Sequence, residues 1–89
     1  MAWIISYDEG AKKDLEKIDR QIARRIRDFM IERVAPLENP RSIGEALRGS
    51  KLGEFWKYRV GDYRVIASIE DGVCRILVVK VGNRKDVYR

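Results

Sequence analysis

The apolar residues of this 89-residue chain change their spacing at Phe55, and that change constrains the fold more than any other feature. Before Phe55, apolar residues recur three and four positions apart, which is the spacing of one helix face. After it, apolar and polar residues alternate in short runs that are separated by turn residues, which is typical of strands. This segregation predicts an α+β fold, with helices packed on one face of a sheet.

Two helices are expected in the N-terminal half, preceded by a short strand. Residues 1 to 7 form an apolar, β-branched and aromatic run that predicts the strand. Helical spacing then covers residues 9 to 17 and 20 to 35. Asp8 and Asp19 immediately precede these ranges and are expected to be N-caps, because a carboxylate accepts the unpaired N–H groups of a first helical turn. The two helices should form a hairpin.

A connecting segment over residues 36 to 54 separates the helices from the remaining strands. Pro36 and Pro40 end the helical pattern because proline cannot continue a helix. We expect one further helical turn near residues 43 to 47.

Three strands are expected in the C-terminal half, over residues 55 to 60, 63 to 69 and 73 to 81. The dipeptides between them, at 61–62 and 71–72, have the composition of two-residue hairpin turns. The strands should therefore form an antiparallel meander. The expected order is β-α-α-β-β-β, a helical hairpin packed on an antiparallel sheet, and a chain of this length is expected to form one domain over residues 1 to 89.

The chain has no histidine, which narrows its chemistry. Serine–histidine and cysteine–histidine catalysis are excluded, and acid–base chemistry must use Tyr, Lys, Arg or carboxylates. The single cysteine, Cys74, cannot form an internal disulfide, and its apolar surroundings in the sequence predict a small buried side chain. No apolar stretch approaches the roughly 20 residues that span a bilayer, and we expect a cytoplasmic protein without a membrane partner.

The net charge of +5 lies entirely in the C-terminal half. Residues 1 to 40 hold eight basic and eight acidic residues, whereas residues 41 to 89 hold eleven basic and six acidic ones. This asymmetry favours an anionic partner for the second half, with nucleic acid as the first candidate. The second helix has arginines too, but acids are interspersed among them, so we interpret that surface as a solvated helix face.

Basic residues are expected to gather on one face of the first hairpin. A turn at 61–62 places Arg59 directly opposite Arg64, and alternation brings Lys57 to the same face. Two arginines opposite each other cost on the order of 0.2 to 1 kcal/mol unless an anion lies between them. These strands contain no acid that would offset the cost. By contrast, Arg75 is expected to be an ordinary solvent-facing strand residue.

The C-terminal tail should add to this basic face. A meander returns the end of its third strand to the start of its second, which brings Arg84 and Tyr88 towards the same end of the sheet. Guanidinium groups can hold a phosphate and stabilise a pentacoordinate transition state, while Tyr88 or Lys57 takes the proton of a 2′-hydroxyl. Unperturbed Tyr and Lys have pKa values near 10, and neighbouring cations lower both. We expect the RNA-binding residues around this site to be Arg48, Lys51, Arg59, Asn83 and Lys85.

Three segments carry a family resemblance that extends along essentially the whole chain: WIISYDEGAKKDLEKID, LRGSKLGEFWKYRVGDYRVIASIEDG and VVKVGNRKDVYR. The sequence resembles the RelE branch of the RelE/ParE toxin superfamily of type II toxin–antitoxin systems. The resemblance implies a RelE-like fold and a messenger-RNA endonuclease that acts in the ribosomal A site, next to ribosomal RNA. It also implies a RelB-like antitoxin as partner, no cofactor, no metal, and cleavage to a 2′,3′-cyclic phosphate and a 5′-hydroxyl.

The same resemblance implies a role for each residue of the basic cluster. Lys57 and Arg59 would contribute a basic strand, and Arg64 would stabilise the phosphate. Arg84 would assist the leaving oxygen or the phosphate, and Tyr88 would act as base or stack on a nucleobase. The sequence departs from its relatives at Asn83, where many have histidine, and at Phe55, where some have lysine.

Two other functions fit the same fold. A ParE-like poison would bind DNA gyrase and perform no RNA chemistry, and a non-catalytic module would bind RNA through the same basic sheet. The first would not require the cluster of Lys57, Arg64, Arg84 and Tyr88. The second predicts that Arg64→Ala weakens RNA binding without any cleavage product.

Overall fold

The computed structural model describes residues 2 to 47 and 54 to 87. Its elements are, in chain order, β1 (Ile4–Tyr7), α1 (Glu9–Lys17), α2 (Arg20–Phe29), the π-helical turn η1 (Met30–Val34), the 3₁₀ helix η2 (Pro40–Ile43), β2 (Glu45–Ala46), β3 (Phe55–Val60), β4 (Tyr63–Glu70), the 3₁₀ helix η3 (Asp71–Val73) and β5 (Arg75–Asn83). This order confirms the α+β class. It adds the short strand β2 to the expected elements.

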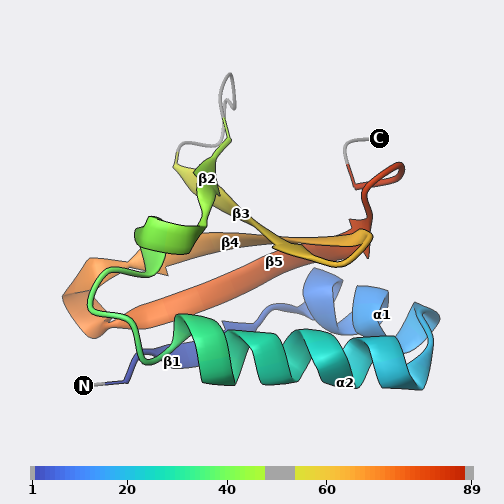
Figure 1. Cartoon of the computed structure of the whole chain (residues 1–89), viewed down its shortest axis with the longest axis horizontal. Helices are drawn as coiled ribbons and strands as arrows, with labels where there is room; N and C mark the ends of the chain where they lie inside the picture. The colour runs from blue at the N-terminus through green and yellow to red at the C-terminus, as the bar shows by residue number, and fades with distance from the viewer. Residues whose placement is uncertain (1, 48–53, 88–89) are drawn as a thin grey trace.

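The sheet has five strands in the order β1-β5-β4-β3-β2. The predicted meander of β3, β4 and β5 is confirmed, and β2 adds to it antiparallel to β3. β1 differs from the expectation of an antiparallel sheet, because it pairs parallel with β5. α1 and α2 lie together on one face of this mixed sheet (Figure 1). None of the helices in the described ranges is long and apolar enough to cross a membrane.

Both expected helix caps are present. The Asp8 carboxylate accepts the Ala11 N–H at 2.9 Å, and the Asp19 carboxylate accepts the Gln21 N–H at 2.9 Å. These contacts satisfy donors that the first turn of a helix leaves unpaired. The second expected helix reaches its predicted end, but its last turn is the π-helical turn η1.

The core lies between the helices and the sheet. Its helical residues recur at the predicted spacing and meet alternate residues of the strands. Members that are fully or almost fully buried include Leu15, Ala23, Ile26, Met30, Val34, Tyr58, Val65, Ile76 and Val78.

Two local predictions in the connections are wrong. The helical turn expected near residues 43 to 47 is η2, which ends at Ile43 because Gly44 continues in extended backbone. The chain then enters β2, since the backbone of residues 45 and 46 pairs with β3.

The connection between β4 and β5 is longer than the expected two-residue turn. Asp71–Val73 form η3, and Cys74 follows with a left-handed backbone at φ 50°. Cys74 is therefore part of the loop instead of the strand, and its thiol is exposed instead of buried. The prediction of a buried cysteine is wrong for this reason.

Candidate functional site

The turn between β3 and β4 sets the register of the hairpin. Gly61 has φ 60°, a conformation that glycine adopts without steric cost, and it precedes Asp62 in the two-residue turn. Arg59 consequently pairs with Arg64, and Val60 pairs with Tyr63. The predicted juxtaposition of the two arginines is confirmed.

Alternation along β3 separates core residues from basic residues. Tyr58 and Val60 are buried in the core, whereas Lys57 and Arg59 lie on the opposite face. Arg64 joins the basic face from β4. A pocket of about 220 Å³, which we call the cationic pocket, is lined by Ile43, Glu45, Lys57, Arg59 and Arg64.

The Arg64 side chain is held at the turn by two hydrogen bonds. Its Nη1 donates to the Gly61 carbonyl at 3.1 Å and to the Tyr63 carbonyl at 3.0 Å. These contacts limit the rotation of a long side chain before any anion binds. A guanidinium that is already oriented loses less conformational entropy when it takes a phosphate.

The cationic pocket also contains a carboxylate that the sequence analysis missed. Glu45 Oε2 lies 3.0 Å from Lys57 Nζ. The hydrogen bond from Lys57 lowers the pKa of the Glu45 carboxyl, and the charges of Arg64 and Arg59 act in the same direction. The acid of the hairpin strands, Glu70 at the end of β4, pairs with Arg75 and does not line this pocket, whereas Glu45 of the neighbouring strand β2 does.

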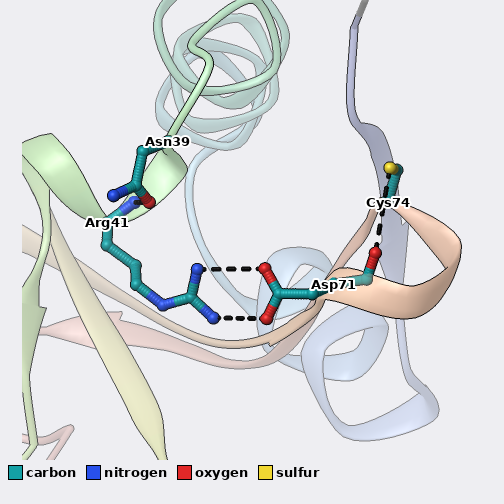
Figure 2. A network of polar contacts seen from close by, with 4 residues as sticks. All are labelled: Asn39, Arg41, Asp71 and Cys74. Atoms are coloured by element: carbon teal, nitrogen blue, oxygen red, sulfur yellow. Dashed lines mark hydrogen bonds and ion pairs between the residues drawn. The ribbon is translucent and has the colours of Figure 1, made fainter.

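The η2–β2 segment that carries Glu45 is held by contacts of Arg41 with η3 and with β3. The two terminal nitrogens of Arg41 donate hydrogen bonds to the two carboxylate oxygens of Asp71, at 3.1 and 2.6 Å (Figure 2). Its guanidinium carbon also lies 5.8 Å from the centroid of the Trp56 ring. The Asn39 side chain accepts the Arg41 N–H at 3.1 Å and caps η2.

A buried hydrogen bond from the core residue Tyr58 also holds this η2–β2 segment in place. The Tyr58 hydroxyl donates to the Pro40 carbonyl at 2.6 Å, and burial raises the pKa of this hydroxyl to about 12. Gly44 passes close to the Tyr58 ring, where a Cβ would lie 3.1 Å from a ring carbon. A side chain at position 44 would therefore require the Tyr58 ring or the backbone at Gly44 to shift by a few tenths of an ångström.

The C-terminal tail returns to the hairpin turn as predicted. The Arg84 N–H donates to the Asp62 carbonyl at 2.8 Å, which places the Arg84 backbone beside the turn. The Asn83 side chain accepts the Lys85 N–H at 3.1 Å and so shapes the bend after β5. Val87 is buried and anchors the tail. Arg84 and Lys85 are exposed, and neither of them lines the cationic pocket.

Three of the expected site residues lie outside the described residues. These are Arg48, Lys51 and Tyr88.

Sequence reasoning also missed Lys80. Lys80 is on β5 and pairs with Ile66 of β4, which in turn pairs with Lys57 of β3. The row of paired residues across these three strands therefore has a lysine at each end. Alternation back from Gly82 could have found it, because Gly82 pairs with Arg64.

The arginines of α2 border a second, larger pocket of about 540 Å³. Arg24 and Arg25 are exposed, which confirms the predicted solvated face. Their pocket shares Arg59 with the cationic pocket, so basic side chains continue from the sheet around to the helix.

Comparison with known proteins shows that this chain is similar to toxins of toxin–antitoxin systems. Residues 5 to 88 match the family described as the ParE toxin of the type II toxin–antitoxin system parDE. The chain is 33% identical to the toxin RelE of Mycobacterium tuberculosis over 85 residues, which cover 96% of this chain and 84% of the relative. It is 29% identical to the mRNA interferase toxin RelE of Escherichia coli, covering 99% of this chain and 92% of the relative.

Solved structures show the same fold. The toxin–antitoxin complex RelBE2 of M. tuberculosis contains a chain with a TM-score of 0.83 and 23% identity, covering 97% of this chain and 95% of that one. A mutant of E. coli RelE in the free state gives a TM-score of 0.75 and 26% identity, covering 99% of this chain and 92% of that one.

Proposed function

Because the chain belongs to the RelE branch of the RelE/ParE superfamily of type II toxins, we propose that it is an endoribonuclease that cuts messenger RNA on the ribosome. Cleavage of translated messenger would stop protein synthesis in the cytoplasm. The observation that carries this proposal is the cationic pocket, in which Lys57, Arg59 and Arg64 converge.

The proposed reaction is an attack by the RNA on its own backbone. A general base takes the proton of a 2′-hydroxyl, and the 2′-oxygen attacks the adjacent phosphorus. The bond from phosphorus to the 5′-oxygen breaks, and that oxygen takes a proton from solvent water, to which the base in turn releases the proton that it removed. The products are a 2′,3′-cyclic phosphate and a 5′-hydroxyl, and the step needs neither a metal nor a cofactor.

Arg59 and Arg64 suit the binding of the phosphate. They lie opposite each other on adjacent strands, and both line the same pocket. The additional negative charge of the pentacoordinate transition state would strengthen these contacts, which is how preorganised donors accelerate a reaction. Arg84, whose backbone lies at the neighbouring turn, would assist the leaving oxygen.

Tyr88 is our choice for the general base, with Lys57 second. The Lys57 ammonium is paired with Glu45 at 3.0 Å, and in that form it donates hydrogen bonds and accepts no proton. Lys57 is therefore better suited to stabilise charge on the phosphate. Tyr88 would alternatively stack on a nucleobase and hold the messenger in line.

The ribosome supplies what a strong base would otherwise provide. The chain has no histidine, so proton transfer relies on groups that are weak bases at neutral pH. Holding the 2′-oxygen in line with the leaving oxygen replaces much of this deficit, because orientation alone accelerates reactions by large factors. We infer that the ribosome bends the messenger into that geometry, in contact with the RNA-binding residues Arg48, Lys51, Asn83 and Lys85.

A cognate RelB-like antitoxin is the proposed inhibitor. The structural relatives include complexes of RelE with RelB from M. tuberculosis and E. coli. An antitoxin segment would neutralise the basic face, cover apolar surface, or do both, and an amphipathic helix in a groove is the usual mode.

The test compares two substrates of the purified protein: messenger RNA in programmed ribosomes and the same messenger without ribosomes. We expect cleavage only on the ribosome, with fragments that end in 2′,3′-cyclic phosphate and begin with a 5′-hydroxyl. Equal cleavage rates on both substrates would refute ribosome dependence. Fragments with a 3′-hydroxyl and a 5′-phosphate would refute attack by the 2′-oxygen.

Gyrase inhibition is the second candidate function, because the matching family carries the ParE name. A gyrase poison has no use for a pocket in which Lys57, Arg59 and Arg64 converge, and this favours the ribonuclease. A supercoiling assay with the same protein preparation separates the two. A third candidate, a non-catalytic RNA-binding module, predicts that RNA binds to the protein but that no fragments form.

A further inference from the structure

We propose that Glu45 acts as an internal competitor of the substrate phosphate, occupying the cationic pocket until RNA displaces it. The inference rests on the proposed function, since the competing ligand is an RNA phosphate. It assigns Glu45 a role in setting the strength of RNA binding. Glu45 also stabilises the fold, because it offsets repulsion among the cations of the pocket.

The geometry of the ion pair supports this role. Glu45 Oε2 lies 3.0 Å from Lys57 Nζ, and the two residues are directly opposite each other on β2 and β3. The Lys57 side chain is 25% exposed, whereas the Glu45 side chain is 75% exposed. The ion pair is thus open to solvent mainly through Glu45, and an RNA phosphate that approaches from solvent would meet this carboxylate.

The three cations of the pocket all stabilise the charged form of the Glu45 carboxylate. Lys57 has the largest effect in lowering the pKa of Glu45, and Arg64 and Arg59 contribute as well. A carboxylate and a phosphate both present anionic oxygens to such donors, so they compete for the same groups. A phosphate that enters while Glu45 stays in place meets a like charge nearby, which weakens its binding.

Glu45 is held over the pocket by its backbone but can leave by rotating its side chain. β2 follows η2, which is fixed by the contact of Arg41 with Asp71 and of Tyr58 with Pro40. The Glu45 carboxylate itself is exposed, so breaking its ion pair costs little. A bound phosphate would then replace it as the partner of Lys57.

The competition is tested with inorganic phosphate as the probe. Phosphate is titrated into wild-type protein and into Glu45→Gln at constant ionic strength, and binding is followed through the NMR signals of the β3–β4 hairpin. We expect Glu45→Gln to bind phosphate about fivefold to tenfold more tightly than wild type. Its thermal unfolding midpoint without phosphate should be lower than that of wild type, because the pocket has lost its counter-charge.

Glu70→Gln is the matched control. It removes the same charge and breaks an ion pair of the same kind, that of Glu70 with Arg75, which lies outside the cationic pocket. Its phosphate affinity should equal that of wild type. An equal gain in both variants would attribute the effect to net charge and overturn the proposal, as would unchanged or weaker binding by Glu45→Gln.

A second variant covers the case in which Glu45→Gln does not fold. Glu45→Asp keeps the charge but shortens the side chain by one methylene, so its reach to Lys57 is reduced. We expect its phosphate affinity to exceed that of wild type by about twofold or more. An affinity equal to that of wild type would contradict the competition.

These binding measurements are independent of cleavage. A wild-type protein that never cuts messenger would refute the proposed function and leave the phosphate result unchanged. Conversely, a Glu45→Gln variant with wild-type phosphate affinity and cleavage slowed at least about a hundredfold would identify Glu45 as a catalytic group, and the competition would be overturned.

Discussion

Arg59 and Arg64 lie directly opposite each other on β3 and β4. Within this fully described hairpin, no acidic side chain forms a hydrogen bond with either arginine. Like charges in such a pair destabilise a sheet. Glu45 supplies part of the missing counter-charge, through its ion pair with Lys57. The cationic pocket therefore combines a cost in stability with a capacity to bind an anion.

Replacing Arg59 with glutamine should stabilise the protein. We expect the free energy of unfolding to rise by on the order of 0.2 to 1 kcal/mol, because the repulsion from Arg64 is removed. Urea unfolding at low and high salt measures this gain, which should shrink as salt screens the charges. Arg75→Gln is the control, since Arg75 has Glu70 as a partner and its loss should bring no gain. A destabilised Arg59→Gln variant would contradict the account of the pair.

Replacing Arg64 with alanine should remove most of the cleavage activity. The expected loss is about a hundredfold to a thousandfold, the effect of deleting one preorganised donor to a transition state. Folding should persist, because within residues 2 to 47 and 54 to 87 the Arg64 guanidinium donates hydrogen bonds only to the carbonyls of Gly61 and Tyr63. Single-turnover cleavage of ribosome-bound messenger measures the rate, with Arg75→Ala expected to remain near wild type. An Arg64→Ala variant with wild-type rate would exclude Arg64 from the site.

Tyr58→Phe should change how stability depends on alkaline pH. The pKa of Tyr58 is about 12 in the fold against about 10 unfolded, so its neutral form stabilises the protein below pH 10. That contribution is lost as pH rises from about 10 through about 12. The phenylalanine variant lacks it, and near neutral pH it should be less stable by about 1 to 3 kcal/mol, because the Pro40 carbonyl loses its buried donor.

Urea unfolding across the alkaline range measures this difference. The gap between wild type and Tyr58→Phe should narrow as pH rises through the window. A gap that stays constant would show that Tyr58 does not titrate with the raised pKa.

Asp71→Asn should lower the stability of the fold at neutral pH, and this loss should become smaller as the pH falls. The hydrogen bond from Arg41 lowers the pKa of Asp71, so the charged form stabilises the protein above the ordinary value of 3.8. The contribution is lost as pH falls through the lowered value. Thermal unfolding is measured from neutral to acid pH. At neutral pH the variant should have a lower unfolding midpoint than wild type, and in acid the two midpoints should become equal. A double-mutant cycle with Arg41→Gln isolates the pair, and a zero coupling energy would contradict the contact.

The sequence predicted those parts of the site that local geometry determines. The turn at Gly61 leaves one register for β3 and β4, and this register brings Arg59 and Arg64 together. The return of the tail to Asp62 follows from the meander.

The remainder depends on contacts between distant residues. β2 has only two residues, too few to show a period, so the position of Glu45 could not be inferred before the pairing with β3 was known. The dipeptide at Asp71 had the composition of a tight turn, yet η3 forms there. The Cys74 carbonyl accepts the Ile4 N–H at 2.9 Å, and this contact with β1 involves a residue far away in the chain.

The central claim is that this chain cuts translated messenger with the cationic pocket, and primer extension in a translating extract tests it most directly. Wild-type protein should produce discrete messenger ends within translated codons, and these ends should be absent with Arg64→Ala and with Tyr88→Phe. Intact messenger in the presence of wild-type protein, together with inhibited supercoiling by gyrase, would contradict the claim.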